Sequence, residues 1–225
     1  MKALSEQLNF ANILMIASAG IMVGALTFTM FEPTVSIAQT SVFTVRQQIT
    51  GEISFLVPPT NVTMIGALAG ITGGNATGTT YAVIQTNSAT GYTMDIAFSN
   101  SPAMLGETTG STALRNYGST TEPTFLLMGS TSAVMAYTVS ASTTTDVDPS
   151  FQSSGSVCNN VGVVSLNNCF KGASTTNFRI INRSTAASSG ATTSIQFRVN
   201  VPNNPSPALQ SDFYTATATL TAVTQ

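Results

Sequence analysis

Two aspartates at alternate positions, Asp146 and Asp148, are the residues whose type and spacing most directly suggest a binding site. They lie in the segment TTTDVDPS, and alternate carboxylates on an extracellular loop can supply oxygen ligands to Ca²⁺. The segment has neither the glycine nor the distal glutamate of an EF-hand loop, and Ca²⁺ takes about six to eight oxygens. Both residues are therefore candidate calcium ligands. A solvated turn beginning at Asp148 is the simpler interpretation, and no cofactor is expected.

The two cysteines, Cys158 and Cys169, are the second candidate for chemistry. In an exported protein a single pair is expected to form a structural disulfide, because redox motifs use closer spacing such as C-x-x-C. The loop between them, CNNVGVVSLNNC, is short, and the chain-entropy model assigns about 3 kcal/mol to closing it. The valines and the leucine within 161–166 predict a small hairpin there.

Other catalytic patterns are missing from the sequence. It has no histidine, which excludes Ser-His-Asp and Cys-His catalysis and histidine metal sites. It has no G-x-S-x-G or P-loop motif, and the glycine-rich segment 70–78 is expected to be a loop. Lys171 is the single lysine after residue 38 and has no S-x-x-K spacing. Nothing in the sequence brings two carboxylates together for glycoside hydrolysis, so no enzymatic activity is expected.

The first 38 residues differ from the rest of the chain. Lys2 is followed by an uncharged, mainly apolar run from Leu8 to Phe31, and Ser36-Ile37-Ala38 forms a small-x-small cleavage pattern before Gln39. This order is typical of a secretory signal peptide. The apolar run is also long enough, at about 20 residues, to span a membrane, so an uncleaved membrane anchor is the alternative. In either case residues 39–225 are expected to form one extracellular or cell-surface domain.

The chain carries few charges: 7 basic and 9 acidic residues make up 7% of it. An ordinary globular protein has about 25%. Binding to a phosphate backbone needs clustered cations, so nucleic-acid partners are not expected. A membrane partner is expected only if the N-terminal segment stays uncleaved. A neutral surface rich in Ser, Thr and Asn lacks the charges that keep sheet edges apart, which favours packing against copies of the chain or against a cell wall.

Alternation with a period of two residues dominates after residue 39 and predicts an all-β fold. The strongest pattern, at 79–99, predicts a hairpin with its turn near Asn87 to Gly91. The other expected strands share this alternation or a richness in β-branched residues, and they are 43–57, 124–128, 134–141, 177–183, 193–201 and 213–224. Short strands separated by turn residues are typical of a single antiparallel β-sandwich, Ig-like or jelly-roll-like, after an N-terminal signal helix.

Two of the expected strands are unusually long. Fully extended, 43–57 would span about 50 Å and 213–224 about 40 Å, whereas typical strands span about 20 Å. A bend at Gly51 explains the first most simply, and the alternative is that one end pairs with another subunit. In 213–224 the threonines at odd positions are expected on one face, with Leu220 and the alanines on the other.

Three short segments, ITGEISF (49–55), TNSATGYTMDI (86–96) and FYTATATLTA (213–222), resemble bacterial secreted β-sandwich proteins of the cell surface, of the WxL-type, spore-coat or fimbrial kind. The chain departs from the WxL group because it has no tryptophan. The resemblance implies an exported bacterial sandwich domain. With the neutral surface, it predicts a structural or adhesive surface protein that self-associates through a terminal strand. A carbohydrate or cell-wall-polymer binding module is the alternative.

Overall fold

The computed structural model describes residues 12–23, 40–118, 123–125, 131–154, 157–160 and 167–225. The residues fall into two units, 1–47 and 48–225, and each is described by itself. In the first unit, residues 12–23 form a helix, and residues 40–47 have neither helix nor strand. None of the described helical residues belongs to a span with the length and hydropathy that crossing a membrane requires.

The second unit is built mainly of strands, as the alternating sequence predicts. Its described strands are, in chain order, β1 (Ile53–Val57), β2 (Gly74–Thr86), β3 (Tyr92–Phe98), β4 (Met104–Gly106), β5 (Ala113–Asn116), β6 (Thr124–Phe125), β7 (Val134–Ala141), β8 (Cys169–Gly172), β9 (Phe178–Arg183), β10 (Ala187–Val201), β11 (Tyr214–Thr215) and β12 (Ala218–Thr224). Two short 3-10 helices, η1 (Thr144–Asp146) and η2 (Pro149–Phe151), lie between β7 and β8. The prediction of a fold dominated by strands is therefore confirmed.

Nine strands form the larger sheet. Seven of its described strands are hydrogen-bonded to their neighbours in the order β1-β2-β10-β7-β5-β4-β11. The other two are β8, which pairs with β7, and β6, which pairs with β8. One pair departs from the predicted antiparallel arrangement, because β5 runs parallel to β7, with Arg115 opposite Val134. β11 is the last strand in this order, and only two residues separate it from β12, which belongs to the smaller sheet. The larger sheet therefore curls around the core toward the smaller one.

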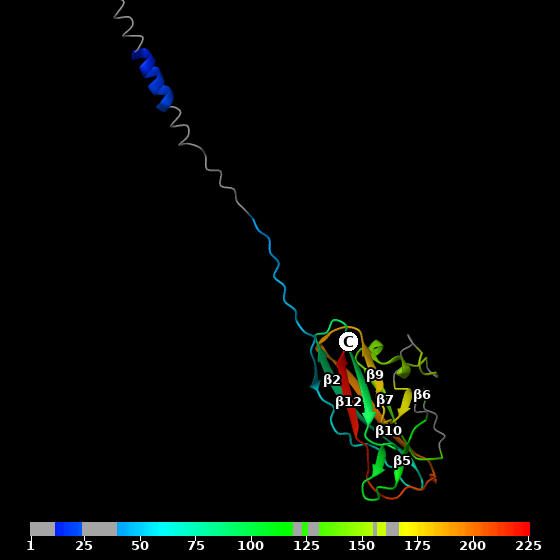
Figure 1. Ribbon diagram of the computed structural model, residues 1–225. Coiled ribbons are helices and arrows are strands. Elements are labelled where there is room, and N and C mark those ends of the chain that lie inside the picture. Colours follow the sequence, from blue (N-terminus) through cyan, green and yellow to red (C-terminus); the bar gives the residue numbers. More distant parts are fainter. Residues whose placement is uncertain (1–11, 24–39, 119–122, 126–130, 155–156, 161–166) are drawn as a thin grey trace, which may run out of the picture. The chain divides into compact units, whose positions relative to one another are not determined.

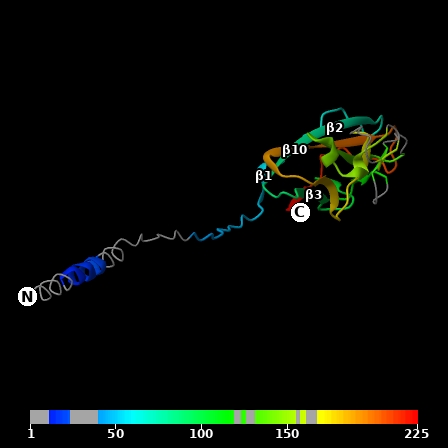
Figure 2. The same cartoon turned by 90° about the horizontal axis from the view of Figure 1, so that it is seen from above.

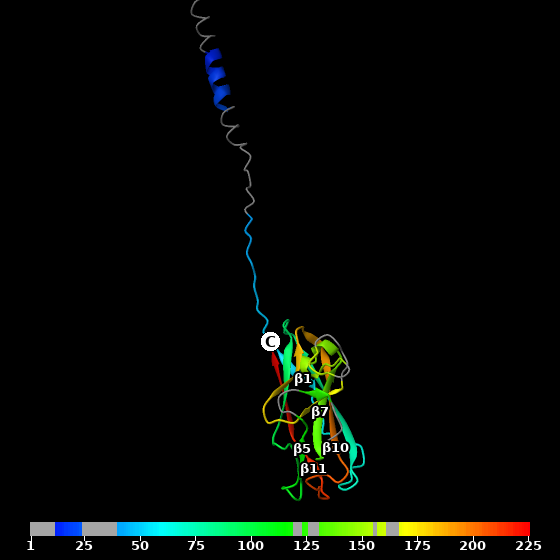
Figure 3. The same cartoon turned by 90° about the vertical axis from the view of Figure 1, so that its right-hand side faces the viewer.

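The smaller sheet has the order β12-β3-β9 and is antiparallel throughout. Figure 1 shows it in front of β10 and β7 of the larger sheet. The view from above in Figure 2 places β2 and β10 in one layer and β3 in the other, and Figure 3 shows the same two layers from the side. β3 therefore lies in a layer that faces the layer of β2 and β10.

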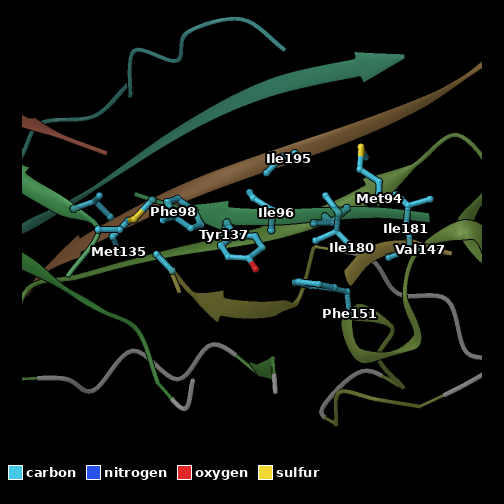
Figure 4. Packing of buried hydrophobic residues seen from close by; sticks show 14 of the residues in the cluster. Met94, Ile96, Phe98, Met135, Tyr137, Val147, Phe151, Ile180, Ile181 and Ile195 are labelled. Atoms are coloured by element: carbon cyan, nitrogen blue, oxygen red, sulfur yellow. The ribbon is translucent and has the colours of Figure 1, made fainter. Parts of the chain in front are cut away.

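The inward faces of both sheets supply one hydrophobic core (Figure 4). Met94, Ile96 and Phe98 occupy alternate positions of β3 and are buried, because successive side chains of a strand point to opposite faces. Opposite them lies Tyr137 of β7, whose ring centroid is 5.7 Å from that of Phe98 and 5.8 Å from that of Phe151. Burial raises the pKa of the Tyr137 hydroxyl well above its usual range.

The segment 79–99 contains two strands, but the predicted hairpin is wrong. β2 pairs with β1 and β10, whereas β3 pairs with β12 and β9, so the two strands belong to different sheets. The connection turns at Gly91, which has φ 81° and whose N–H donates to the Ser88 carbonyl at 3.1 Å. Both strands direct their apolar positions into the shared core, so their alternation reflects packing between sheets and not cross-strand pairing.

Two other expectations are corrected. Within 43–57, strand structure begins only at Ile53, two residues after Gly51, so the long first strand is wrong. Within 70–78, β2 begins at Gly74, so the second half of that glycine-rich segment is strand and not loop. The predicted hairpin at 161–166 and the end of the predicted strand 124–128 lie outside the described residues.

The C-terminal segment keeps its predicted faces but not its continuity. It divides into β11, which pairs with β4, and β12, which pairs with β3 along its whole length. Leu220 and Ala222 pack against the core, whereas Thr217, Thr219 and Thr221 are exposed. The threonine ladder is therefore a solvent-facing surface of the smaller sheet.

Candidate functional site

One side of the two facing sheets, next to β7 and β9, is closed by η1 and η2. The Asp146 carboxylate on η1 is largely buried and accepts a hydrogen bond from Nη1 of Arg183 on β9. The next residue, Val147, forms a bridge to Ile181, and the Asp148 N–H donates to the Ile180 carbonyl at 3.0 Å. These bonds attach the connection after β7 to the edge of the smaller sheet.

The two candidate calcium ligands have different partners within the protein. Asp146 pairs with Arg183, whereas Oδ1 of Asp148 accepts hydrogen bonds from the N–H and the hydroxyl of Ser150, at 3.0 and 2.6 Å. Asp148 thereby caps η2, consistent with the turn interpretation. Among the described residues, no group of three or more Asp, Glu, His or Cys side chains could hold a metal ion. Calcium binding stays an untested prediction from the sequence.

The predicted disulfide is confirmed: Cys158 and Cys169 are bonded, with their Cα atoms 5.8 Å apart. Cys169 begins β8 and is fully buried. Disulfides form and persist in oxidising compartments, so the bond indicates an environment outside the reducing cytoplasm. Lys171, two residues along β8, is also buried, and its Nζ lies 4.0 Å from the centroid of the Phe178 ring. This cation–π contact gives Lys171 a structural role.

The opposite side of the two sheets is open and forms a groove of about 920 Å³. One wall is β12, the edge strand of the smaller sheet, through Ala218 and Leu220. The other wall is the segment 59–64, which follows β1. The floor is apolar and comes from both sheets, with Ile96 and Phe98 from β3 and Ile195, Phe197 and Val199 from β10. We call this feature the edge groove.

The wall formed by 59–64 lies beside β2 without being a strand. The Thr60 N–H donates to Oγ1 of Thr80, and this hydroxyl donates back to the Thr60 carbonyl, both at 2.9 Å. Farther along, Val62 packs against Gly78. A β-carbon at position 78 would lie 2.4 Å from Cγ1 of Val62. Glycine at position 78 therefore allows this wall to approach β2 so closely.

The rim of the edge groove carries two carboxylates, Glu107 and Asp212, and the described residues that line the groove include no lysine or arginine. Asp212 fixes its own loop: its oxygens accept hydrogen bonds from the backbone N–H groups of Thr108, Thr109 and Phe213 and from the Thr109 hydroxyl. Led by the Thr109 N–H, these donors lower the pKa of Asp212 to about 2. These bonds tie Asp212 to the loop at Thr108 and Thr109.

A second feature belongs to the segment before β1. Four apolar side chains there are highly exposed, with exposed fractions of 95% for Val42, 81% for Phe43, 82% for Val45 and 84% for Ile49. The segment 40–52 has no helix or strand. Exposed apolar side chains that follow one another in this way are typical of segments that bind a partner. We call residues 42–49 the interaction segment.

Sequence reasoning singled out 43–57 as a long strand, with pairing to another subunit as an alternative, but it missed the edge groove. The groove depends on which strands are sheet edges, and a wrongly predicted hairpin places β2 and β3 in one sheet. One signal pointed to its wall: Pro58-Pro59 ends β1 while the apolar alternation continues at Val62 and Met64.

Comparisons of the chain with family models, curated proteins and solved structures found no match. Its function is therefore inferred from the residues of this chain.

Proposed function

We propose that this protein is an exported, non-enzymatic structural or adhesive component of the bacterial cell surface that associates with copies of itself through a terminal strand. Its domain would be a single, mostly antiparallel β-sandwich in which β12-β3-β9 packs on the larger sheet. The disulfide supports export, and the resemblance of three segments to secreted bacterial sandwich proteins supports the cell surface.

The observation that carries this proposal is the exposure of Val42, Phe43, Val45 and Ile49 in a segment without a strand. Phe43, Val45 and Ile49 are at odd positions and would share one face of a strand, whereas Val42 would point to the other face. Leaving such residues in water is unfavourable, at about 25 cal/mol per Å² of apolar surface. Addition of the segment to a sheet edge of another copy would remove that cost and satisfy its backbone hydrogen-bonding groups.

The test is the concentration dependence of the molecular mass. The protein is expressed from the full sequence, exported and purified, and its intact mass establishes whether the chain begins at Gln39. Sedimentation velocity across a wide concentration range is then compared for the unchanged protein and a variant lacking residues 40–48. We expect assemblies larger than a monomer for the first and a monomer for the second.

A matched pair of point variants controls for the deletion. The triple change Phe43→Ser, Val45→Ser and Ile49→Ser removes the apolar face, whereas Thr40→Ala, Thr44→Ala and Gln48→Ala leaves it intact. Only the first should abolish assembly. A protein that stays monomeric at high concentration, or assembly that survives the deletion of 40–48, would overturn the proposal.

A further inference from the structure

We propose that the edge groove is the acceptor site for residues 42–49 of a second copy of this chain. This inference rests on the self-association proposed above and names the surface that receives the segment. Three observations carry it: an unprotected edge strand in one wall, an apolar lining and opposite charges.

The β12 wall can bind a strand through its backbone. β12 is the edge of the smaller sheet, with β3 as its strand partner in the described chain. The free side of an edge strand presents a row of unpaired N–H and C=O groups, which is a template for another strand. β12 also lacks the usual protection of an edge, because its seven residues, ATLTAVT, include no charged residue and no proline.

The floor suits the apolar face of the segment. Met104, Phe197 and Leu209 are only partly buried, pack against the core and line the edge groove, so apolar side chains beside the core are accessible from this side. An inserted strand would direct Phe43, Val45 and Ile49 toward that floor and its other side chains toward solvent. The inserted strand would then cover the core on the side opposite the bonds of Asp146 and Val147.

Charge agrees with the same occupant. The interaction segment has one ionised side chain between residues 40 and 51, that of Arg46, and the groove rim has Glu107 and Asp212 with no basic residue in its described lining. Electrostatic complementarity of this kind fixes register and partner choice.

The interaction segment and the edge groove are different surfaces of the chain. Each copy can therefore insert its segment into one neighbour and bind the segment of another in its own groove. Such a heterologous contact produces an open chain of subunits, or a ring when the rotation closes. Assembly should therefore continue beyond a dimer, which fits a structural role at a cell surface.

Photo-crosslinking maps the acceptor directly. A benzoylphenylalanine in place of Phe43 in the full exported protein is irradiated in a mixture of ¹⁴N- and ¹⁵N-labelled copies, and mixed-isotope peptides are identified by mass spectrometry. We expect crosslinks between copies to peptides that contain 59–64 or 218–220. The same probe in place of Tyr81, an exposed aromatic residue outside the groove lining, should give no crosslinks to these peptides.

Substitutions in the two walls give an independent readout. Ala218→Arg and Thr63→Arg each place an unpaired charge in the edge groove and should weaken association by about 10-fold or more. Both residues are exposed, so the monomer should fold. Thr219→Arg is the matched control, because Thr219 neighbours Ala218 but is not part of the lining, and it should change association by less than about twofold.

The outcomes separate this inference from the proposed function. If the protein assembles through residues 40–48 but crosslinks elsewhere, and both groove substitutions are neutral, the groove assignment is overturned and the self-association stands. If crosslinks join position 43 to the groove of its own copy, the acceptor is intramolecular and the inference is likewise overturned. A protein that does not assemble at all overturns both.

Discussion

Nη1 of Arg183 on β9 donates to the carboxylate of Asp146 on η1, and this ion pair closes one side of the space between the two sheets. Arg183 adds two bonds to backbone carbonyls, from Nε to Thr185 at 3.0 Å and from Nη2 to Ala186 at 3.1 Å. On the opposite side the partly buried side chains of Phe197 and Leu220 line the open edge groove. The asymmetry between a closed and an open side underlies the functional proposal.

Asp146→Asn should destabilise the domain by about 2 kcal/mol, because it leaves the guanidinium of Arg183 without its counter-charge in a mostly buried place. Urea denaturation measures the loss. The control is Asp95→Asn, which removes a more exposed ion pair with Arg179, with exposed side-chain fractions of 25% and 43%, and should cost less than about 1 kcal/mol. Equal losses in the two variants would contradict the structural importance of the Asp146 pair.

Replacing both Cys158 and Cys169 by alanine should lower the free energy of unfolding by about 3 kcal/mol, because the unfolded chain regains the freedom of an open loop. The measurement is denaturation of both proteins under identical non-reducing conditions. Assembly should persist in the variant where it remains folded, since the disulfide does not line the edge groove. A variant as stable as the unchanged protein would show that the bond is not a structural staple.

The Asp212 carboxyl should titrate near pH 2, below its ordinary pKa value of 3.8, because backbone N–H groups bind its ionised form. The carboxyl ¹³C chemical shift measures this directly. Its folded pKa lies below its unfolded pKa, so its contribution to stability is present above about pH 3.8 and is lost as the pH falls toward 2. Asp212→Asn should flatten this acid dependence, whereas an unchanged acid profile would contradict the role of these bonds.

Arg46→Glu should weaken self-association by about two- to fivefold, because the proposed binding would place the new carboxylate near the acids Glu107 and Asp212 of the groove rim. Combining it with Glu107→Arg should restore most of the loss, and the effect should shrink at high salt because exposed charges are screened. Arg115→Glu reverses an exposed cation that does not line the groove, and it serves as the control. Equal weakening by Arg46→Glu with and without Glu107→Arg would place Arg46 away from Glu107.

Local patterns predicted the strands better than their partners. The sequence predicted β3, β7 and residues 193–201 of β10 as strands, and the alternation in β3 also predicted its buried face, since burial of one face of a strand leaves a period of two in the sequence. Alternation does not say which strand lies alongside, and this is why 79–99 looked like a hairpin although its halves belong to facing sheets. The parallel pairing of β5 with β7 left no local signal either.

The candidate site was predicted in part for the same reason. The segment 42–49 was recognised because its apolar alternation is a local property, whereas the edge groove arises from residues as far apart as Thr60, Ile96 and Leu220. The disulfide between Cys158 and Cys169 was predictable because the chain offers no other pairing. Asp146 and Asp148 share a sequence motif but have separate partners, because a turn directs the two carboxylates to Arg183 and Ser150.

The most direct test of the central claim mixes two variants that cannot assemble alone. One lacks residues 40–48 and keeps its edge groove, and the other carries Ala218→Arg and keeps its interaction segment. If the segment of one copy binds the groove of another, sedimentation equilibrium should show each variant as a monomer and their mixture as a 1:1 heterodimer that does not grow further. A mixture that stays monomeric, while the unchanged protein assembles, would contradict the account.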